Sequence, residues 1–201
     1  ATNFSRKFYE DNGFFLKKGG LEICRTDDDA RWEELKRKVE SGKAFGTNVR
    51  LISAAEAKEK FPLLDEGSIR GAMWDPDAGL VTPRSQDVVN FAVETAKDKG
   101  ALKTFTDTPA TGFEIEGGRI TGVKTEKGLI RTNKVVITSG IWGPLMGDMA
   151  GVPVPLMPVE HPLLFFGPLP EIQGTKELLV YPLLRDQGNS AYVRDLSLIH
   201  I

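Results

Sequence analysis

Residues 134–143 have the sequence KVVITSGIWG, and this stretch decides the fold class of the 201-residue chain. Lys134 to Thr138 is a β-branched run without polar alternation, which predicts a strand covered on both faces. The run leads into Ser139-Gly140, and a short helix is expected from Trp142 to Met149. A strand, a glycine turn and a helix in this order predict an open α/β sheet, in which ligands bind at the carboxyl ends of the strands.

The turn at Ser139-Gly140 is a candidate binding element. A glycine there lets a bound group approach the backbone closely, and the amides that open the next helix favour a diphosphate. Glycine turns between strands and helices also occur where nothing binds. From the residues alone, both a binding role and a purely structural role stay open.

The stretch before this strand predicts a helix followed by an antiparallel meander. The helix is capped by Thr82 or Ser85 and ends before Gly100, with its apolar residues at helical spacing. Three strands and two turns are then expected, the strands over residues 102–105, 110–116 and 120–125 and the turns at 117–118 and 126–128.

The N-terminal part of the chain predicts short helices and strands in alternation. Ser53 and Glu56 form a capping box, and Pro62 ends the helix that it opens. Cys24 is expected to be buried within a strand. The other expected elements are a helix that closes at 12–13, strands over 20–25, 49–52 and 69–74, a helix from 27–29 to about 42, and a turn at 75–79. Beyond Gly151, prolines at 153, 155, 158 and 162 favour extended backbone.

The composition excludes several classes of protein. With 40% hydrophobic and 27% charged residues, the chain is expected to be a soluble α/β protein of mixed (α+β) character. The net charge of −2 and the scattered lysines and arginines provide no basic stripe for nucleic acid. No apolar run approaches the roughly 20 residues that span a bilayer, so no membrane partner is expected and a cytoplasmic location is the default. The single Cys24 and the lack of a Cys/His cluster in the sequence argue against an internal disulfide and a metal site.

Both ends of the sequence indicate an internal piece of a longer protein. The chain starts with Ala1 in place of Met, inside a predicted helix. Residues 196–201, with the sequence LSLIHI, match one translation of a transposon adapter used in DNA sequencing, and we expect this tail to belong to no element of the fold. The alternative is a short apolar edge strand. If the tail is an adapter, His161 is the only histidine of the natural sequence.

Seven short motifs, taken together, resemble one family of flavoenzymes. They lie in order between Gly19 and Arg194, and although each is modest alone, their collinear succession is specific. The motifs are GGLEI (19–23), LKRK (35–38), RLISAAE (50–56), FPLLD (61–65), DAGL (77–80), GGRITGV (117–123) and SGIWG (139–143). They are similar to bacterial dimethylglycine oxidase and to the sarcosine and dimethylglycine dehydrogenases, flavoproteins with a fold like that of D-amino-acid oxidase.

The resemblance implies a fragment of a discontinuous FAD-binding domain interleaved with an antiparallel-sheet substrate domain. Residues 1–76 would hold the end of the N-terminal FAD segment and the first part of the substrate domain, 77–151 the second part of the FAD-binding domain, and 152–195 the second part of the substrate domain. The family's G-x-G-x-x-G turn and its ribose-binding acidic residue would precede Ala1. Tetrahydrofolate is implied as a second ligand, bound by a C-terminal region outside this chain.

The resemblance also implies residues that bind the cofactor. Ala110 matches a position whose backbone contacts the adenine end of the flavin cofactor. Ser139, Gly140 and Trp142 belong to the matching glycine turn and are expected to bind FAD with it. Tyr192 matches a tyrosine that lies at both the flavin and the substrate.

Two residues are expected to take part in catalysis, His161 and Tyr192. His161 matches the family's histidine near the substrate, although a lone histidine in an apolar stretch is often a satisfied core residue. The segment Pro162–Phe166 departs from the family's pattern after this histidine, which puts the identity of the substrate in doubt.

The implied reaction is the FAD-dependent oxidation (demethylation) of N-methylated amino acids such as dimethylglycine or sarcosine, by hydride transfer to flavin. One alternative is another FAD amine or amino-acid oxidoreductase of this fold, of the glycine or proline type. A second is a non-catalytic tRNA-modifying or regulatory homologue that uses the fold as a binding module. Flavin reduction by N-methylated glycines distinguishes these hypotheses.

Overall fold

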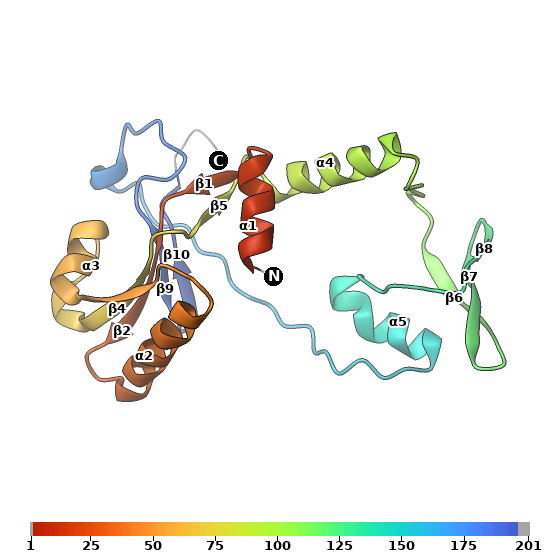
Figure 1. Cartoon of the computed structure of the whole chain (residues 1–201), viewed down its shortest axis with the longest axis horizontal. Coiled ribbons are helices and arrows are strands. Elements are labelled where there is room, and N and C mark those ends of the chain that lie inside the picture. The colour runs from red at the N-terminus through yellow and green to blue at the C-terminus, as the bar shows by residue number, and fades with distance from the viewer. Residues whose placement is uncertain (1, 197–201) are drawn as a thin grey trace. The chain divides into compact units, whose positions relative to one another are not determined.

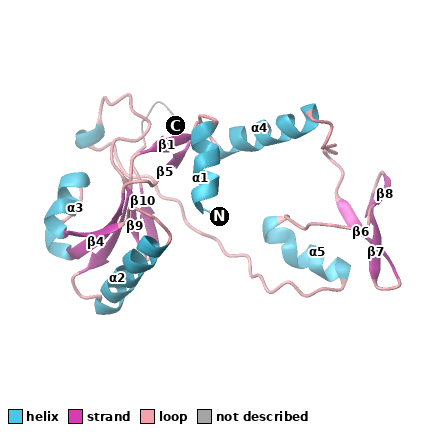
Figure 2. Ribbon diagram, viewed as in Figure 1, coloured by secondary structure: helices cyan, strands magenta, loops and turns pink. Residues whose placement is uncertain are grey.

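The computed structural model describes residues 2–196, which divide into two compact units (Figure 1). Unit 1 combines the residues up to Thr95 with those from Phe166 on, and unit 2 is Ala96–Phe165. Helices and strands occur in both units (Figure 2), so the mixed α/β class with several sheets is confirmed. The predicted bounds of the FAD-binding and substrate domains stay a prediction.

Unit 1 is built on a five-stranded sheet and a two-stranded sheet. The larger sheet has the spatial order β10-β9-β2-β4-β3, and all neighbours in it are antiparallel except β2 and β9. Its strands are β2 (Gly20–Arg25), β3 (Arg50–Ser53), β4 (Ile69–Asp75), β9 (Leu183–Asp186) and β10 (Ala191–Val193). Because β9 and β10 come from the second segment of unit 1, residues far apart in the sequence meet in one sheet.

Helices α2 (Asp29–Ala44) and α3 (Ala54–Lys60) cover opposite faces of the larger sheet. Ile23 pairs with Ala72, and both lie in the hydrophobic core with Ala57 of α3. Successive side chains of a strand point to opposite faces, so Glu22 points away from this core. There its carboxylate lies 2.6 Å from the Lys38 ammonium of α2. The burial of Cys24 in β2 is confirmed.

The starts of both helices confirm the predicted N-terminal signals. The Asp28 side chain accepts a hydrogen bond from the Arg31 amide at 2.9 Å, and the Ser53 side chain accepts one from the Glu56 amide at 3.1 Å. Of the predicted capping box, the structure shows the serine half. The Glu56 carboxylate pairs with Arg50 of β3 and so joins the helix to the sheet.

The remaining elements of unit 1 are α1 (Thr2–Asp11), β1 (Phe15–Lys17), η1 (Glu66–Ser68), β5 (Gly79–Val81), α4 (Ser85–Asp98, which continues into unit 2) and η3 (Pro170–Ile172).

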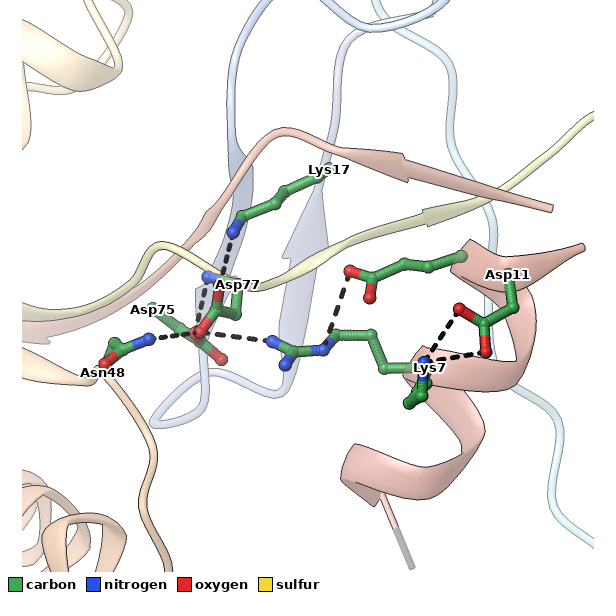
Figure 3. Close-up of polar contacts among 8 residues, drawn as sticks. Lys7, Asp11, Lys17, Asn48, Asp75 and Asp77 are labelled. Carbon is green, nitrogen blue, oxygen red and sulfur yellow. Dashed lines mark hydrogen bonds and ion pairs between the residues drawn. The ribbon is translucent and has the colours of Figure 1, made fainter. Parts of the chain in front are cut away.

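The smaller sheet of unit 1, in which β1 pairs with β5, is joined to its surroundings through Asp77 (Figure 3). The Asp77 carboxylate, in the turn before β5, binds Lys17 of β1, Arg6 of α1 at 3.2 Å and Asn48 at 2.8 Å. The hydrogen bond from Lys17 is the main cause that lowers the pKa of Asp77 to about 2.

Unit 2 contains a three-stranded antiparallel meander and a short helix. Its elements are β6 (Ala110–Glu116), β7 (Arg119–Thr125), β8 (Gly128–Arg131), η2 (Gly140–Trp142) and α5 (Gly143–Ala150). Helix α5 packs against β6 and ends at Gly151, whose φ of 70° is the left-handed geometry of a helix C-cap. The backbone then passes so close to α5 that a Cβ on Gly147 would lie 2.5 Å from the Val152 carbonyl oxygen.

Two predicted strands are wrong. Residues 102–105 and 134–138 form neither helix nor strand, and Val136 is 83% exposed where burial on both faces was expected. A strand needs a neighbour for its backbone groups, and no described segment pairs with either run. The meander takes its third strand from β8, directly after the predicted turn. The predicted adapter tail lies outside the described residues except for Leu196.

Candidate functional site

The turn that opens α5 in unit 2 carries three of the expected cofactor-binding residues. Ser139 precedes η2, and Gly140 begins it with a φ of 56°. The Ser139 hydroxyl is buried and has no hydrogen-bond partner among the described residues. A Cβ added at Gly140 would meet nothing within 4 Å, so the backbone is open there. Trp142, at the end of η2, is 62% exposed.

The geometry of this turn fits a phosphate-bearing group such as the diphosphate of FAD. A phosphate oxygen would accept the hydrogen bond that the buried Ser139 hydroxyl does not make within the described chain. The glycine at 140 allows close approach to the backbone, whereas the amides of Trp142 and Gly143 already bond the carbonyl oxygens of Ser139 and Gly140. The residues present therefore fit the cofactor that the resemblance implies.

Ala110 begins β6, the strand against which α5 packs. It is half-buried and pairs with Thr125, and the register of the β6–β7 ladder shifts directly after it. Such an irregularity leaves backbone groups without a ladder partner. The backbone beside Ala110 is thus suited to contact a ligand, as expected from the resemblance, and this role stays a prediction.

His161 lies in unit 2, on the extended stretch after Gly151. Its side chain is exposed, and its Nδ1 lies 3.3 Å from the carbonyl oxygen of the adjacent Pro162. The interpretation of His161 as a satisfied core histidine is therefore wrong. A role near the substrate stays a prediction.

Tyr192 lies in unit 1, on the edge strand β10. Its ring is 64% exposed, and it stands directly opposite Arg185 of β9. The guanidinium carbon of Arg185 lies 4.8 Å from the centre of the Tyr192 ring, in a cation–π contact. His161 and Tyr192 thus belong to different units.

Sequence reasoning missed Arg185 as a possible functional side chain. Arg185 belongs to none of the seven motifs, but the sequence around it carried a signal. Residues 183–186 and 191–193 flank a turn, and in a hairpin of this length Arg185 and Tyr192 are cross-strand partners. The seven-residue spacing of Arg185 and Tyr192 across this turn therefore predicts that their side chains lie side by side.

Unit 1 also contains a cavity of about 340 Å³ beside the Asp77 network, between α1 and the loop that carries Asn48. None of the expected site residues lines it. Within residues 2–196, no group of three or more His, Cys, Asp or Glu side chains could hold a metal ion. No helix in this part of the chain is both long and apolar enough to cross a membrane.

Comparison with known proteins supports the resemblance over almost the whole described chain. A family model described as DAO, FAD dependent oxidoreductase, matches residues 2–196. The mitochondrial sarcosine dehydrogenase of Homo sapiens is 31% identical over 94% of this chain, and the mitochondrial dimethylglycine dehydrogenase of Rattus norvegicus is 28% identical over 90% of it. The chain spans 20% of the length of each of these relatives.

A solved structure shares the fold. The crystal structure of L-proline dehydrogenase from P. horikoshii superimposes with a TM-score of 0.72 and 33% sequence identity. The match covers 94% of this chain and 49% of the L-proline dehydrogenase chain.

Proposed function

We propose, because the chain belongs to the family of FAD-dependent oxidoreductases, that the protein oxidises N-methylated amino acids such as dimethylglycine and sarcosine. One observation carries the proposal: the similarity to a sarcosine dehydrogenase extends over 94% of this chain. A dimethylglycine dehydrogenase matches over 90% of it. The proposed activity is that of the complete protein, because the relatives are much longer than this chain.

The residues of unit 2 supply part of the proposed cofactor site. The Ser139 hydroxyl would donate a hydrogen bond to a phosphate oxygen, and Gly140 would admit that phosphate to the backbone. Ala110 would contact the adenine end through its backbone, and Trp142 offers an exposed aromatic face. FAD, when bound, supplies the acceptor for the hydride that leaves an N-methyl carbon of the substrate.

His161 and Tyr192 are the proposed catalytic residues. The His161 imidazole would hydrogen-bond the substrate amine and favour its neutral form, whose lone pair is available as the hydride leaves the methyl carbon. Tyr192 would orient the substrate through its phenol and its exposed ring. The resulting iminium is hydrolysed by water to the demethylated amine and formaldehyde. The substrate is a small molecule, and we propose a cytoplasmic location.

A second candidate is the oxidation of L-proline. The solved L-proline dehydrogenase is 33% identical in sequence, and the match covers 94% of this chain. The match to the sarcosine dehydrogenase covers the same share of this chain. Proline and sarcosine are both secondary amines that carry a carboxylate on the neighbouring carbon. A site of the same chemistry therefore serves either substrate.

Anaerobic mixing of the complete, FAD-loaded protein with dimethylglycine, sarcosine and L-proline distinguishes the candidates. The proposal expects bleaching of the flavin absorbance with the two N-methylated amino acids and release of formaldehyde. Bleaching by L-proline alone, without formaldehyde, supports the second candidate. Binding of FAD without bleaching by any of the three contradicts both.

A further inference from the structure

We propose that Arg185 recognises the carboxylate of the substrate, with its guanidinium held in place by the Tyr192 ring. The inference rests on the proposed function, since it assigns Tyr192 to the substrate site. It applies equally to dimethylglycine, sarcosine and L-proline, because all three carry a carboxylate. Neither the sequence motifs nor the comparisons assign a role to Arg185.

Strand pairing places Arg185 in one row with two other polar side chains. It stands opposite Tyr192 of β10 on one side and beside Glu22 of β2 on the other. Directly paired residues of neighbouring strands point to the same face of a sheet. The row therefore lies on the face that also carries Lys38 of α2, on the side opposite the core that α3 covers.

The charges along this row leave Arg185 without an anionic partner. Glu22 is only 6% exposed, and its carboxylate lies 2.6 Å from the Lys38 ammonium. No ion pair to Arg185 exists within residues 2–196, and its Nε is buried without a hydrogen-bond partner there. A guanidinium offers hydrogen-bond donors alone, so the unmet Nε–H needs an acceptor. An unsatisfied buried donor costs roughly 1–3 kcal/mol, which a bound anion would offset.

The geometry of the Arg185 side chain suits a carboxylate. Contact with the Tyr192 ring, 4.8 Å from the guanidinium carbon to the ring centre, restricts the orientation of the planar fork. An arginine fork donates two parallel hydrogen bonds to the two oxygens of a carboxylate. Arg185 is half-buried beside the exposed Tyr192 ring, so part of its side chain is open to solvent and to a small ligand. An amine held through its carboxylate here would lie against the Tyr192 phenol.

The test compares two amines that differ in the carboxylate alone. N,N-dimethylethanolamine has the dimethylamine group of dimethylglycine but a neutral alcohol in place of its carboxylate. The complete FAD-loaded protein is compared with its Arg185→Met and Arg185→Lys variants, and with Arg119→Met as a control at an exposed arginine of β7. Calorimetry on the protein with its flavin already reduced measures the binding of dimethylglycine without turnover, and the concentration dependence of anaerobic flavin reduction gives an apparent KM for both amines.

We expect Arg185→Met to weaken dimethylglycine binding and raise its KM by roughly 10- to 100-fold, without a change for the alcohol. The KM of Arg185→Lys for dimethylglycine should lie between those of the parental protein and of Arg185→Met, because lysine keeps the positive charge but not the planar fork. Should Arg185→Met fail to fold, the KM of Arg185→Lys relative to that of the parental protein, compared between the two amines, decides. Equal effects on both amines, or none on either, overturn the inference. If no amine reduces the flavin, the proposed function fails, and the calorimetric loss on substitution still decides the role of Arg185.

Discussion

At the scale of single residues, Asp77 is the side chain on which the contacts of the smaller sheet converge (Figure 3). Hydrogen bonds from Lys17 and Asn48 lower its pKa from the ordinary 3.8 to about 2. The folded state therefore binds this proton less readily than the unfolded state. The ionised Asp77 carboxylate therefore stabilises the folded state fully above pH 3.8, and this contribution is lost as the pH falls through about 2.

We expect Asp77→Asn to destabilise the protein by about 1–2 kcal/mol at neutral pH, after screening by solvent. The difference from the parental protein should shrink as the pH falls below the ordinary value of 3.8. Urea unfolding at several pH values measures this. Asp11→Asn is the control, because Asp11 forms an exposed pair with Lys7 on α1 and should cost little. If the difference in unfolding free energy between Asp77→Asn and the parental protein does not change with pH, the ionisation of Asp77 does not contribute to stability as proposed.

His161 gives a second prediction at this scale. Because its side chain is exposed and, among the described residues, its ring nitrogen contacts the Pro162 carbonyl alone, His161→Ala should leave the melting temperature nearly unchanged. If His161 binds the substrate amine, the same variant should reduce FAD about a hundredfold more slowly, or about 2.7 kcal/mol of barrier. Met157→Ala, in the same extended stretch and 84% exposed, is the control. A rate within about twofold of the parental value would remove His161 from the site.

Single residues also show where sequence reasoning stops. Ser53 and Cys24 were predicted correctly, because capping and burial in a strand follow from neighbours in the sequence. The contacts of Arg185 and the convergence on Asp77 depend on residues brought together by pairing across the sheets. The candidate site residues were named by resemblance, and their roles are still predictions.

At the scale of elements, the same division holds. The predicted strand over 110–116 has the bounds of β6, because Gly117-Gly118 ends it and Phe113 and Ile115 alternate with polar residues. The run at 134–138 has the composition of a buried strand but forms none, because no described segment offers it a partner. Local pattern thus predicts the capacity to form a strand, and pairing decides whether the strand forms.

The docking of extended backbone onto α5 gives a prediction for this scale. At Gly147 a Cβ would lie 2.5 Å from both the Val152 carbonyl oxygen and a Val154 methyl carbon. Alanine favours a helix over glycine by about 1 kcal/mol, but this overlap should make Gly147→Ala destabilising by about 1–3 kcal/mol. Gly143→Ala is the matched control in the same helix, since its nearest contact is an ordinary 3.5 Å. If both variants have equal thermal stability, the close approach is not part of the native fold.

At the scale of the whole molecule, family membership and activity rest on different supports. The family match covers residues 2–196, so it concerns the whole described chain. The activity is a proposal for the complete protein, because this chain spans 20% of the length of its sarcosine and dimethylglycine dehydrogenase relatives. The proposed residues are distributed over both units, with Ser139, Gly140 and His161 in unit 2 and Tyr192 and Arg185 in unit 1. Their roles therefore have to be measured on the complete protein.

The most direct measurement follows FAD reduction by sarcosine with a deuterated N-methyl group. The central claim is that a hydride leaves the N-methyl carbon, so breaking the carbon–deuterium bond in its place should slow reduction. Anaerobic stopped-flow traces of the complete, FAD-loaded protein with N-CH₃ and N-CD₃ sarcosine are compared. The account predicts rapid reduction by sarcosine, a slower rate with the N-CD₃ form and deuterated formaldehyde as product. Equal rates together with formaldehyde-free oxidation, or no reduction by sarcosine or dimethylglycine, would contradict it.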